Sequence, residues 1–153
     1  MFRKILIATD GSWLAERAAR VAVALAKGIG GERVALSATR RPAAGPGGLE
    51  TQADLDAAFA SAHQDAIAHT GRDGAFARCA GVPCQAVTAV SAFPGDEIIH
   101  AAGQNGCDLI VLGAHGERSV PPLVASGVAR QVLGYGSVPV LMLRDAPRPE
   151  HGP

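Results

Sequence analysis

Short apolar runs recur along the chain, and each is bounded by residues that favour turns. Runs of this length that are apolar throughout are typical of parallel strands, which are buried on both faces. The run CDLIVLGAH is the most apolar of the set. We therefore expect five strands, at 2–10 (FRKILIATD), 33–39 (RVALSAT), 83–90 (PCQAVTAV), 107–115 (CDLIVLGAH) and 137–144 (SVPVLMLR).

The segments between these runs favour helices. Glycine-rich residues 28–31 end the first helix. An alanine-rich stretch at 50–69 is consistent with an exposed helix, and further helices are expected at 94–106 and 126–136. The Pro and Gly content of 40–48 predicts an irregular loop. In the first helix, the apolar residues that recur at helical spacing are Leu14, Ala18, Val21, Ala22, Leu25 and Ala26.

Strands and helices thus alternate five times, which favours an α/β fold. Because right-handed crossovers place helices above and below a parallel sheet, we expect a five-stranded, doubly wound parallel sheet with helices on both faces. Residues 1–144 would form this one domain, and 145–153 (DAPRPEHGP) a flexible tail.

The composition narrows the classes of function. The 153 residues are 48% apolar with a formal net charge of zero, so one packed domain is expected without a basic surface for nucleic acid or anionic lipid. The apolar runs are too short to span a bilayer, and no signal peptide is recognisable. Cys79, Cys84 and Cys107 have no metal-ligand spacing, which indicates free thiols in a cytoplasmic protein. His63, His69 and His100 likewise predict no zinc site.

Two turns follow strands at positions where doubly wound folds bind ligands. In such sheets, ligands collect at the carboxyl ends of strands where the strand order reverses. The turns are TDGS at 9–12, after the first strand, and GAHG at 113–116, after the fourth. If these strands are neighbours across the reversal, the two turns face one crevice.

Three stretches resemble the universal stress protein family over nearly the whole chain. KILIATDGS resembles the opening strand and turn of the family, PGDEIIHAAGQNGCDLIVLGAHG its third helix and fourth strand, and VARQVLGYGSVPVLML its last helix and strand. The resemblance implies a Rossmann-like sheet with strand order 3-2-1-4-5. Nucleotide-binding members carry Gly, two residues, Gly, nine residues, then Gly before Ser or Thr. Gly113 and Gly116 match, whereas Ser126-Gly127 reverses the order of the last pair.

The resemblance also implies a site for ATP, AMP or ADP. Glycines let backbone N–H groups approach phosphate oxygens, and a following helix N-terminus adds unpaired donors. Asp10 would lie near the ribose and phosphates and hold Mg²⁺, while the backbone of Thr39 would face adenine. The residues that the resemblance assigns to the nucleotide are Ala8, Thr9, Asp10, Thr39, Gly113, His115, Gly116, Ser126, Gly127 and Val128.

Several of these residues have a simpler interpretation. Ser126 is also a good N-cap for the last helix, and Asp10 or Ser12 for the first. Pro121-Pro122 removes N–H donors from the spacer. His115 belongs to no nucleophile motif and is interpreted as a polar loop residue beside the crevice, not as a catalytic base.

Three functions remain open. The first is a cytoplasmic stress-response regulator that binds an adenine nucleotide and is not an enzyme. The second is a dimeric interaction module of the same family that has lost nucleotide binding, and the third is a weak ATPase. The resemblance further implies a homodimer through the last strand, Val138 to Leu143, with Val140 and Met142 either in the contact or in the internal core.

Overall fold

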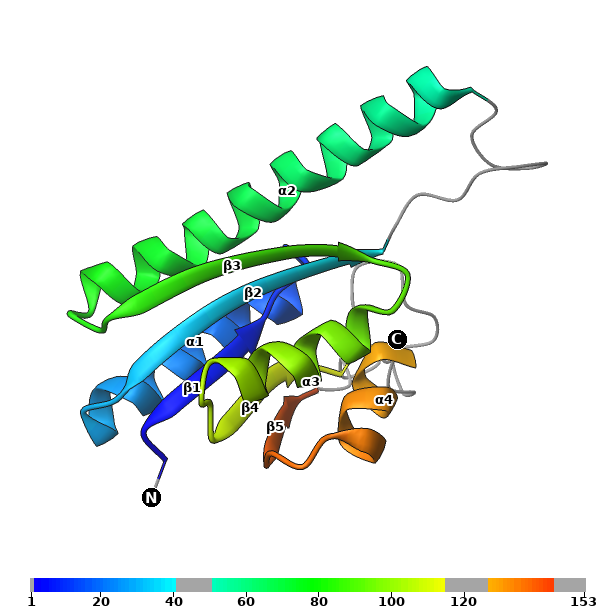
Figure 1. Cartoon of the computed structure of the whole chain (residues 1–153). Helices are drawn as coiled ribbons and strands as arrows, with labels where there is room; N and C mark the ends of the chain where they lie inside the picture. Colours follow the sequence, from blue (N-terminus) through cyan, green and yellow to red (C-terminus); the bar gives the residue numbers. More distant parts are fainter. Residues whose placement is uncertain (1, 41–50, 115–126, 145–153) are drawn as a thin grey trace, which may run out of the picture.

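The computed structural model describes residues 2–40, 51–114 and 127–144 (Figure 1). Strands and helices alternate along these residues. In chain order they are β1 (Lys4–Ala8), α1 (Trp13–Ile29), β2 (Glu32–Arg40), α2 (Gln52–Cys79), β3 (Cys84–Ser91), α3 (Pro94–Gln104), β4 (Leu109–Gly113), α4 (Gly127–Tyr135) and β5 (Val140–Leu143).

The five strands form one parallel sheet in the order β3-β2-β1-β4-β5, which confirms the predicted fold. The central strand β1 pairs with β2 on one side and with β4 on the other, so that Ile7 lies opposite both Ala35 and Val111. The chain first builds outward from β1 to β3 and then crosses to β4 and β5. The reversal of strand order therefore falls between β1 and β4.

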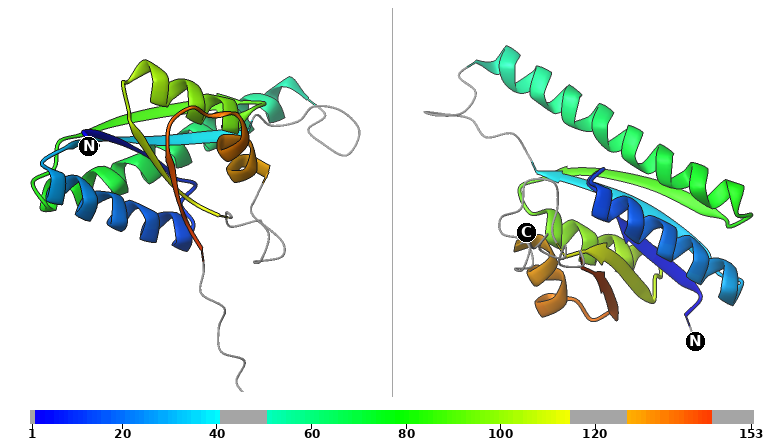
Figure 2. Two further views of the ribbon diagram at one scale, coloured as in Figure 1. Left: turned by 90° about the horizontal axis from the view of Figure 1, so that it is seen from below. Right: turned by 180° about the vertical axis from the view of Figure 1, so that it is seen from behind.

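Helices cover both faces of the sheet (Figure 2). On one face, Ile5 and Ile7 pack with an alanine-rich side of α1 and with Ala77 of α2. On the other face, Leu6 packs with Ile98 of α3 and residues of α4. The division follows from the period of two in a strand, because successive side chains point to opposite faces.

Helix α2 is longer than the sequence predicts. Whereas the composition indicates a helix over 50–69, α2 continues to Cys79. The reason is tertiary packing, because Ala66, Thr70, Asp73 and Ala77 recur at helical spacing and all are buried. The opposite end of α2 projects past the ends of β2 and β3 (Figures 1 and 2).

The first helix and the strand ends also differ in detail. Leu25, expected on the inner face of α1, is 37% exposed, and Val23 is buried in its place. Strands β1 and β4 span five residues each and are shorter than the apolar runs that predict them. Within the described ranges, no helix combines the length and the apolar character that crossing a bilayer requires.

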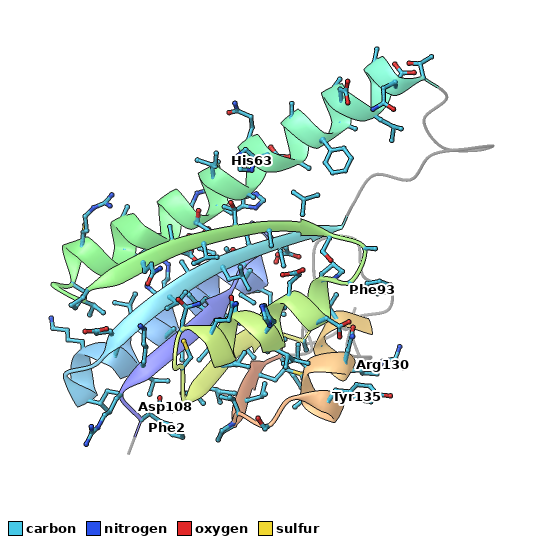
Figure 3. All side chains as sticks on the ribbon, viewed as in Figure 1. Phe2, His63, Phe93, Asp108, Arg130 and Tyr135 are labelled. Carbon is cyan, nitrogen blue, oxygen red and sulfur yellow. The ribbon has the colours of Figure 1, made fainter. Side chains whose placement is uncertain are left out.

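The edge where the strands begin is held by one carboxylate. Asp108 accepts hydrogen bonds from the backbone N–H groups of Arg3 and Lys4, at 2.8–3.0 Å. These bonds tie the start of β1 to the start of β4. In Figure 3, Phe2 and Asp108 lie at this amino edge, whereas Phe93 lies beyond the end of β3.

Candidate functional site

The turns after β1 and β4 meet at the carboxyl edge of the sheet. Ile7 pairs with Val111 close to the ends of both strands, so the chain leaves β1 and β4 at the same edge of the sheet. Ala114, the next residue, donates its N–H to the carbonyl of Leu143 in β5 (2.8 Å). The reversal of strand order thus brings the turn after β1 and the described start of the turn after β4, Gly113 and Ala114, to one edge.

The turn after β1 is closed by its own side chains. Thr9 is buried, and its N–H donates to the carbonyl of Leu36 in β2 (2.9 Å). Its Oγ1 accepts the N–H of Gly11 (3.2 Å), and Oδ1 of Asp10 accepts the N–H of Ser12 (2.9 Å). Such side-chain to backbone bonds fix turns built from Thr and Asp. Two backbone donors of this turn are therefore engaged within it.

Ser12 is the N-cap of α1. Its Oγ accepts the N–H of Ala15 (3.2 Å), and its backbone is extended, as an N-cap requires. Of the two predicted capping residues, Ser12 therefore caps the helix, while Asp10 braces the preceding turn and is exposed. Because α1 begins here, its N-terminal partial positive charge faces the carboxyl edge.

Gly11 adopts a conformation that only glycine reaches readily, with φ of +77°. It is also in close contact with His69 of α2. A Cβ at Gly11 would lie 2.5 Å from Cδ2 and 2.8 Å from Cε1 of the His69 ring, and closer still to Nε2. No pattern in the sequence indicates this contact, because 58 positions separate His69 from Gly11 and the two residues share no motif.

The structure brings only part of the predicted site together. Ala8, Thr9, Asp10 and Gly113 lie at the carboxyl edge, where β1 and β4 end. Thr39 lies near the end of β2, paired with Val90 of β3. The described residues do not include His115, Gly116 and Ser126.

The last helix begins at Gly127, and Val128 packs against the core on the α3 side of the sheet. Gly127 is exposed, and a Cβ there would meet no atom of the described residues within 4 Å. Position 127 thus has room for a side chain. The family pattern places Ser or Thr at this position, after a glycine.

No metal centre is preassembled in the described part of the chain, where no three His, Cys, Asp or Glu side chains converge. Asp10 is the carboxylate of the turn after β1. One carboxylate fits Mg²⁺ that is bound mainly through the phosphates of a nucleotide, because this ion keeps several waters and takes one or two protein ligands.

A charged cluster is buried beneath α2, on the same face of the sheet as α1. Arg33 of β2 and Asp73 of α2 are 1% and 2% exposed. Nη1 of Arg33 donates to the carbonyl of Asp73 (3.4 Å). Nε and Nη2 of Arg33 and Oδ2 of Asp73 are buried without a hydrogen-bond partner among the described residues.

Burial controls the titration of this cluster. It raises the pKa of Asp73 to about 6, although attraction by Arg33 and Arg72 lowers it; repulsion by Glu16 adds to the rise. Burial also lowers the pKa of Arg33 and raises that of Cys84, which pairs with Arg33 across the strands. In each case desolvation of the charged form outweighs the neighbouring charges.

Strand β5 is an edge strand, as expected. Val140 and Met142 are predicted to lie either in a dimer contact or in the internal core. Their side chains are partly buried against the core on the α3 and α4 side, which favours the internal core. Leu141, which points the other way, is 38% exposed. A homodimer through Val138 to Leu143 stays a prediction.

Comparisons with solved structures support the fold. Hypothetical protein MJ0577 matches with a TM-score of 0.84 and 21% identity, over 97% of this chain and 99% of its own. A universal stress protein in complex with cAMP matches with a TM-score of 0.69 and 19% identity, over 95% and 99%. The universal stress protein from Archaeoglobus fulgidus in complex with dAMP gives 0.62 and 22%, over 93% and 97%.

A search of curated proteins found no match to the sequence. The sequence profile of the universal stress protein family, in contrast, matches residues 1–144, which include every described strand and helix. The chain therefore belongs to the universal stress protein family.

Proposed function

We propose that this chain binds ATP or a related adenine nucleotide at the carboxyl edge of the sheet. The observation that carries the proposal is the meeting of two turns, Thr9–Ser12 and Gly113–Ala114, at the reversal of strand order. The cAMP and dAMP complexes of relatives with the same fold support an adenine nucleotide as the ligand. From its membership of the family alone, we further propose that the protein acts as a cytoplasmic regulator in the stress response and not as an enzyme.

In this proposal the N-terminus of α1 and the turn after β4 face the phosphates. Asp10 lies on the turn between them, so its carboxylate would hold Mg²⁺ against phosphate oxygens. The end of β2 at Thr39 would offer backbone groups to adenine. His115, Gly116 and Ser126 belong to the proposed contacts through the family pattern alone, and Gly127 and Val128 follow them at the start of α4.

The open space at Gly127 bears on the reversed Ser126-Gly127 pair. Since no atom of the described part of the chain lies within 4 Å of a Cβ there, crowding by those residues does not explain the absence of a hydroxyl at 127. The loss of one neutral hydrogen bond costs about 0.5–1.5 kcal/mol, which weakens binding at most about tenfold. We therefore propose that the reversed pair reduces affinity without abolishing it.

A second function is favoured by the closed turn after β1. The N–H groups of Gly11 and Ser12 donate to side chains of their own turn, so phosphates would have to compete with Thr9 and Asp10 for them. A member with this turn could serve as a homodimeric interaction module, assembled through the β5 edge. In that case nucleotide would have no effect on stability.

Thermal unfolding with and without ATP and Mg²⁺ tests the proposal. A nucleotide at about 100 times its dissociation constant stabilises the folded state by roughly 2.7 kcal/mol, which raises the midpoint by several degrees. We expect this rise in the natural chain and a larger one in Ser126→Gly/Gly127→Ser. An unchanged midpoint in both proteins would overturn nucleotide binding and favour the interaction module.

Asp10→Asn is the matched variant for the metal. Asparagine keeps an oxygen that accepts the N–H of Ser12, so the turn is preserved while the charge is removed. We expect this variant to lose the additional stabilisation that Mg²⁺ gives to ATP, and to respond to AMP as the natural chain does. An equal response to ATP with Mg²⁺ would exclude Asp10 as a metal ligand.

A further inference from the structure

His69 of α2 is packed against the turn that carries Asp10. The ring occupies the space where any side chain at Gly11 would begin, with Cδ2 and Cε1 2.5 Å and 2.8 Å from a Cβ at that position. Gly11 is therefore required twice, for its positive φ and for the approach of the ring. The two residues form an interlocked contact between α2 and the turn after β1.

Helix α2 is itself held firmly at this level. Ala66 and Thr70, the neighbours of His69 on the inner face, are buried, and the Thr70 hydroxyl donates to the carbonyl of Ala66 (3.0 Å). Further along, the guanidinium of Arg20 in α1 lies over the ring of Phe76 (4.6 Å), which joins the two helices. The His69 ring therefore contacts the turn from a fixed support.

The contact is one of packing. Nδ1 of His69 is buried and has no hydrogen-bond partner within the described ranges. A buried polar atom without a partner costs free energy, so the nitrogen is not what makes the ring favourable here. The ring stabilises the turn through its shape and volume.

The turn is held at its two ends and by bonds within it. One end is fixed by the bond from the N–H of Thr9 to Leu36, and the other by the Ser12 cap. Between them, the bonds to Thr9 Oγ1 and Asp10 Oδ1 close the turn locally, and the ring of His69 packs against Gly11 from α2. We propose that His69 is a positioning residue, whose ring holds this turn so that Asp10 and the first turn of α1 face the phosphates of the nucleotide. The nucleotide part of this inference rests on the proposed function.

Three variants test the role of the ring. His69→Ala removes it, His69→Phe keeps a ring of similar size without either ring nitrogen, and His63→Ala is a control at an exposed histidine of the same helix (Figure 3). The first measurement is amide hydrogen exchange at Gly11 and Ser12 in the nucleotide-free protein. We expect about tenfold faster exchange in His69→Ala and natural rates in the other two.

The second measurement is the affinity for ATP with Mg²⁺ by calorimetry. We expect about tenfold weaker binding in His69→Ala, and natural affinity in His69→Phe and His63→Ala. Natural exchange rates in His69→Ala would overturn the proposal, as would natural affinity despite faster exchange. A loss in His69→Phe equal to that in His69→Ala would also overturn it, because the nitrogen would then be essential.

A further test asks whether removal of His69 raises or lowers the melting temperature in two backgrounds. This sign test remains valid if a single variant is poorly folded. Gly11→Ala combines backbone strain with a clash against His69, whereas Gly11→Ala/His69→Ala retains only the strain. Removal of His69 should therefore raise the melting temperature in the Gly11→Ala background and lower or not change it in the natural chain. A decrease in both backgrounds would show that the two residues are not interlocked.

Failure of the proposed function can be distinguished from failure of the proposed role of His69. If the natural chain binds no adenine nucleotide, calorimetry reports no heat for any protein, and the nucleotide site is excluded. Hydrogen exchange and the sign test still report whether the ring positions the turn, since neither needs a ligand.

Discussion

The two faces of the sheet are packed with different chemistry. The face covered by α3 and α4 is apolar throughout, with Leu6, Leu36 and Ile110 at its centre. The face covered by α1 and α2 combines small apolar residues with buried Arg33 and Asp73. All four buried unpartnered side-chain atoms in the described ranges belong to Arg33, His69 and Asp73, which lie in this layer.

The two layers therefore contribute differently to stability. An apolar layer contributes stability that does not depend on pH, because nothing in it titrates under ordinary conditions. A layer with buried charges is less stable, since burial of charge costs free energy unless the partners are ideal. It is this second layer, through α2, that contacts the turn of the candidate site.

The largest effect is expected on the apolar face. Leu6→Ala removes a fully buried side chain in the central strand and should destabilise the fold by about 4 kcal/mol. Because no ionisable group is involved, the loss should be equal at pH 5 and pH 7.5, as measured by urea unfolding. A loss that changes by more than about 1 kcal/mol between these values would mean that the two layers are coupled.

The next effect is a pH dependence on the other face. The pKa of Asp73 is about 6 when folded, above its ordinary value of 3.8, so the folded state binds the proton more tightly than the unfolded state. The contribution of Asp73 to the free energy of unfolding is therefore greatest below about pH 4. It falls as the pH rises to about 6, by on the order of 3 kcal/mol.

Asp73→Asn isolates this contribution. The asparagine cannot ionise, so the decrease in stability between pH 4 and pH 7 that Asp73 causes should be absent from the variant and should appear as the difference between the two pH profiles. Urea unfolding at several pH values measures it. An identical pH profile in both proteins would contradict the assignment of this titration to Asp73.

The smallest effect concerns two helix caps at different depths. Ser12, which is buried, caps α1 at the candidate site, and Thr51, which is exposed, caps the projecting end of α2 through the N–H of Asp54 (3.0 Å). Ser12→Ala should cost about 1 kcal/mol, and Thr51→Ala less than about 0.5 kcal/mol. Equal losses in urea unfolding would show that the projecting end of α2 is as firmly held as the start of α1.

The fold could be predicted because its signals are local. Five short apolar runs separated by helical patterns are enough to indicate a doubly wound sheet, and the immediate neighbours narrow the cap of the first helix to Asp10 or Ser12, of which the structure shows Ser12. The order of the strands came through the family resemblance and is confirmed.

The contacts between distant residues could not be predicted. Arg33 and Asp73 are 40 positions apart, and nothing near either residue indicates that the other is buried beside it. The same holds for His69, whose role depends on how α2 crosses the sheet. The length of α2 was underestimated because Gly71 and Gly74 weaken the local helical signal, whereas burial on β2 and β3 decides the outcome.

The parallel sheet also determines which end of the chain is suited to a label, an affinity tag or a sensor surface. The chain enters at the amino edge beside Asp108, and β5 ends at the opposite edge, where the carbonyl of Leu143 receives the N–H of Ala114. A fluorescent label, affinity tag or sensor surface joined at the N-terminus would therefore leave the candidate site facing solution. The same group joined just after β5 would crowd it.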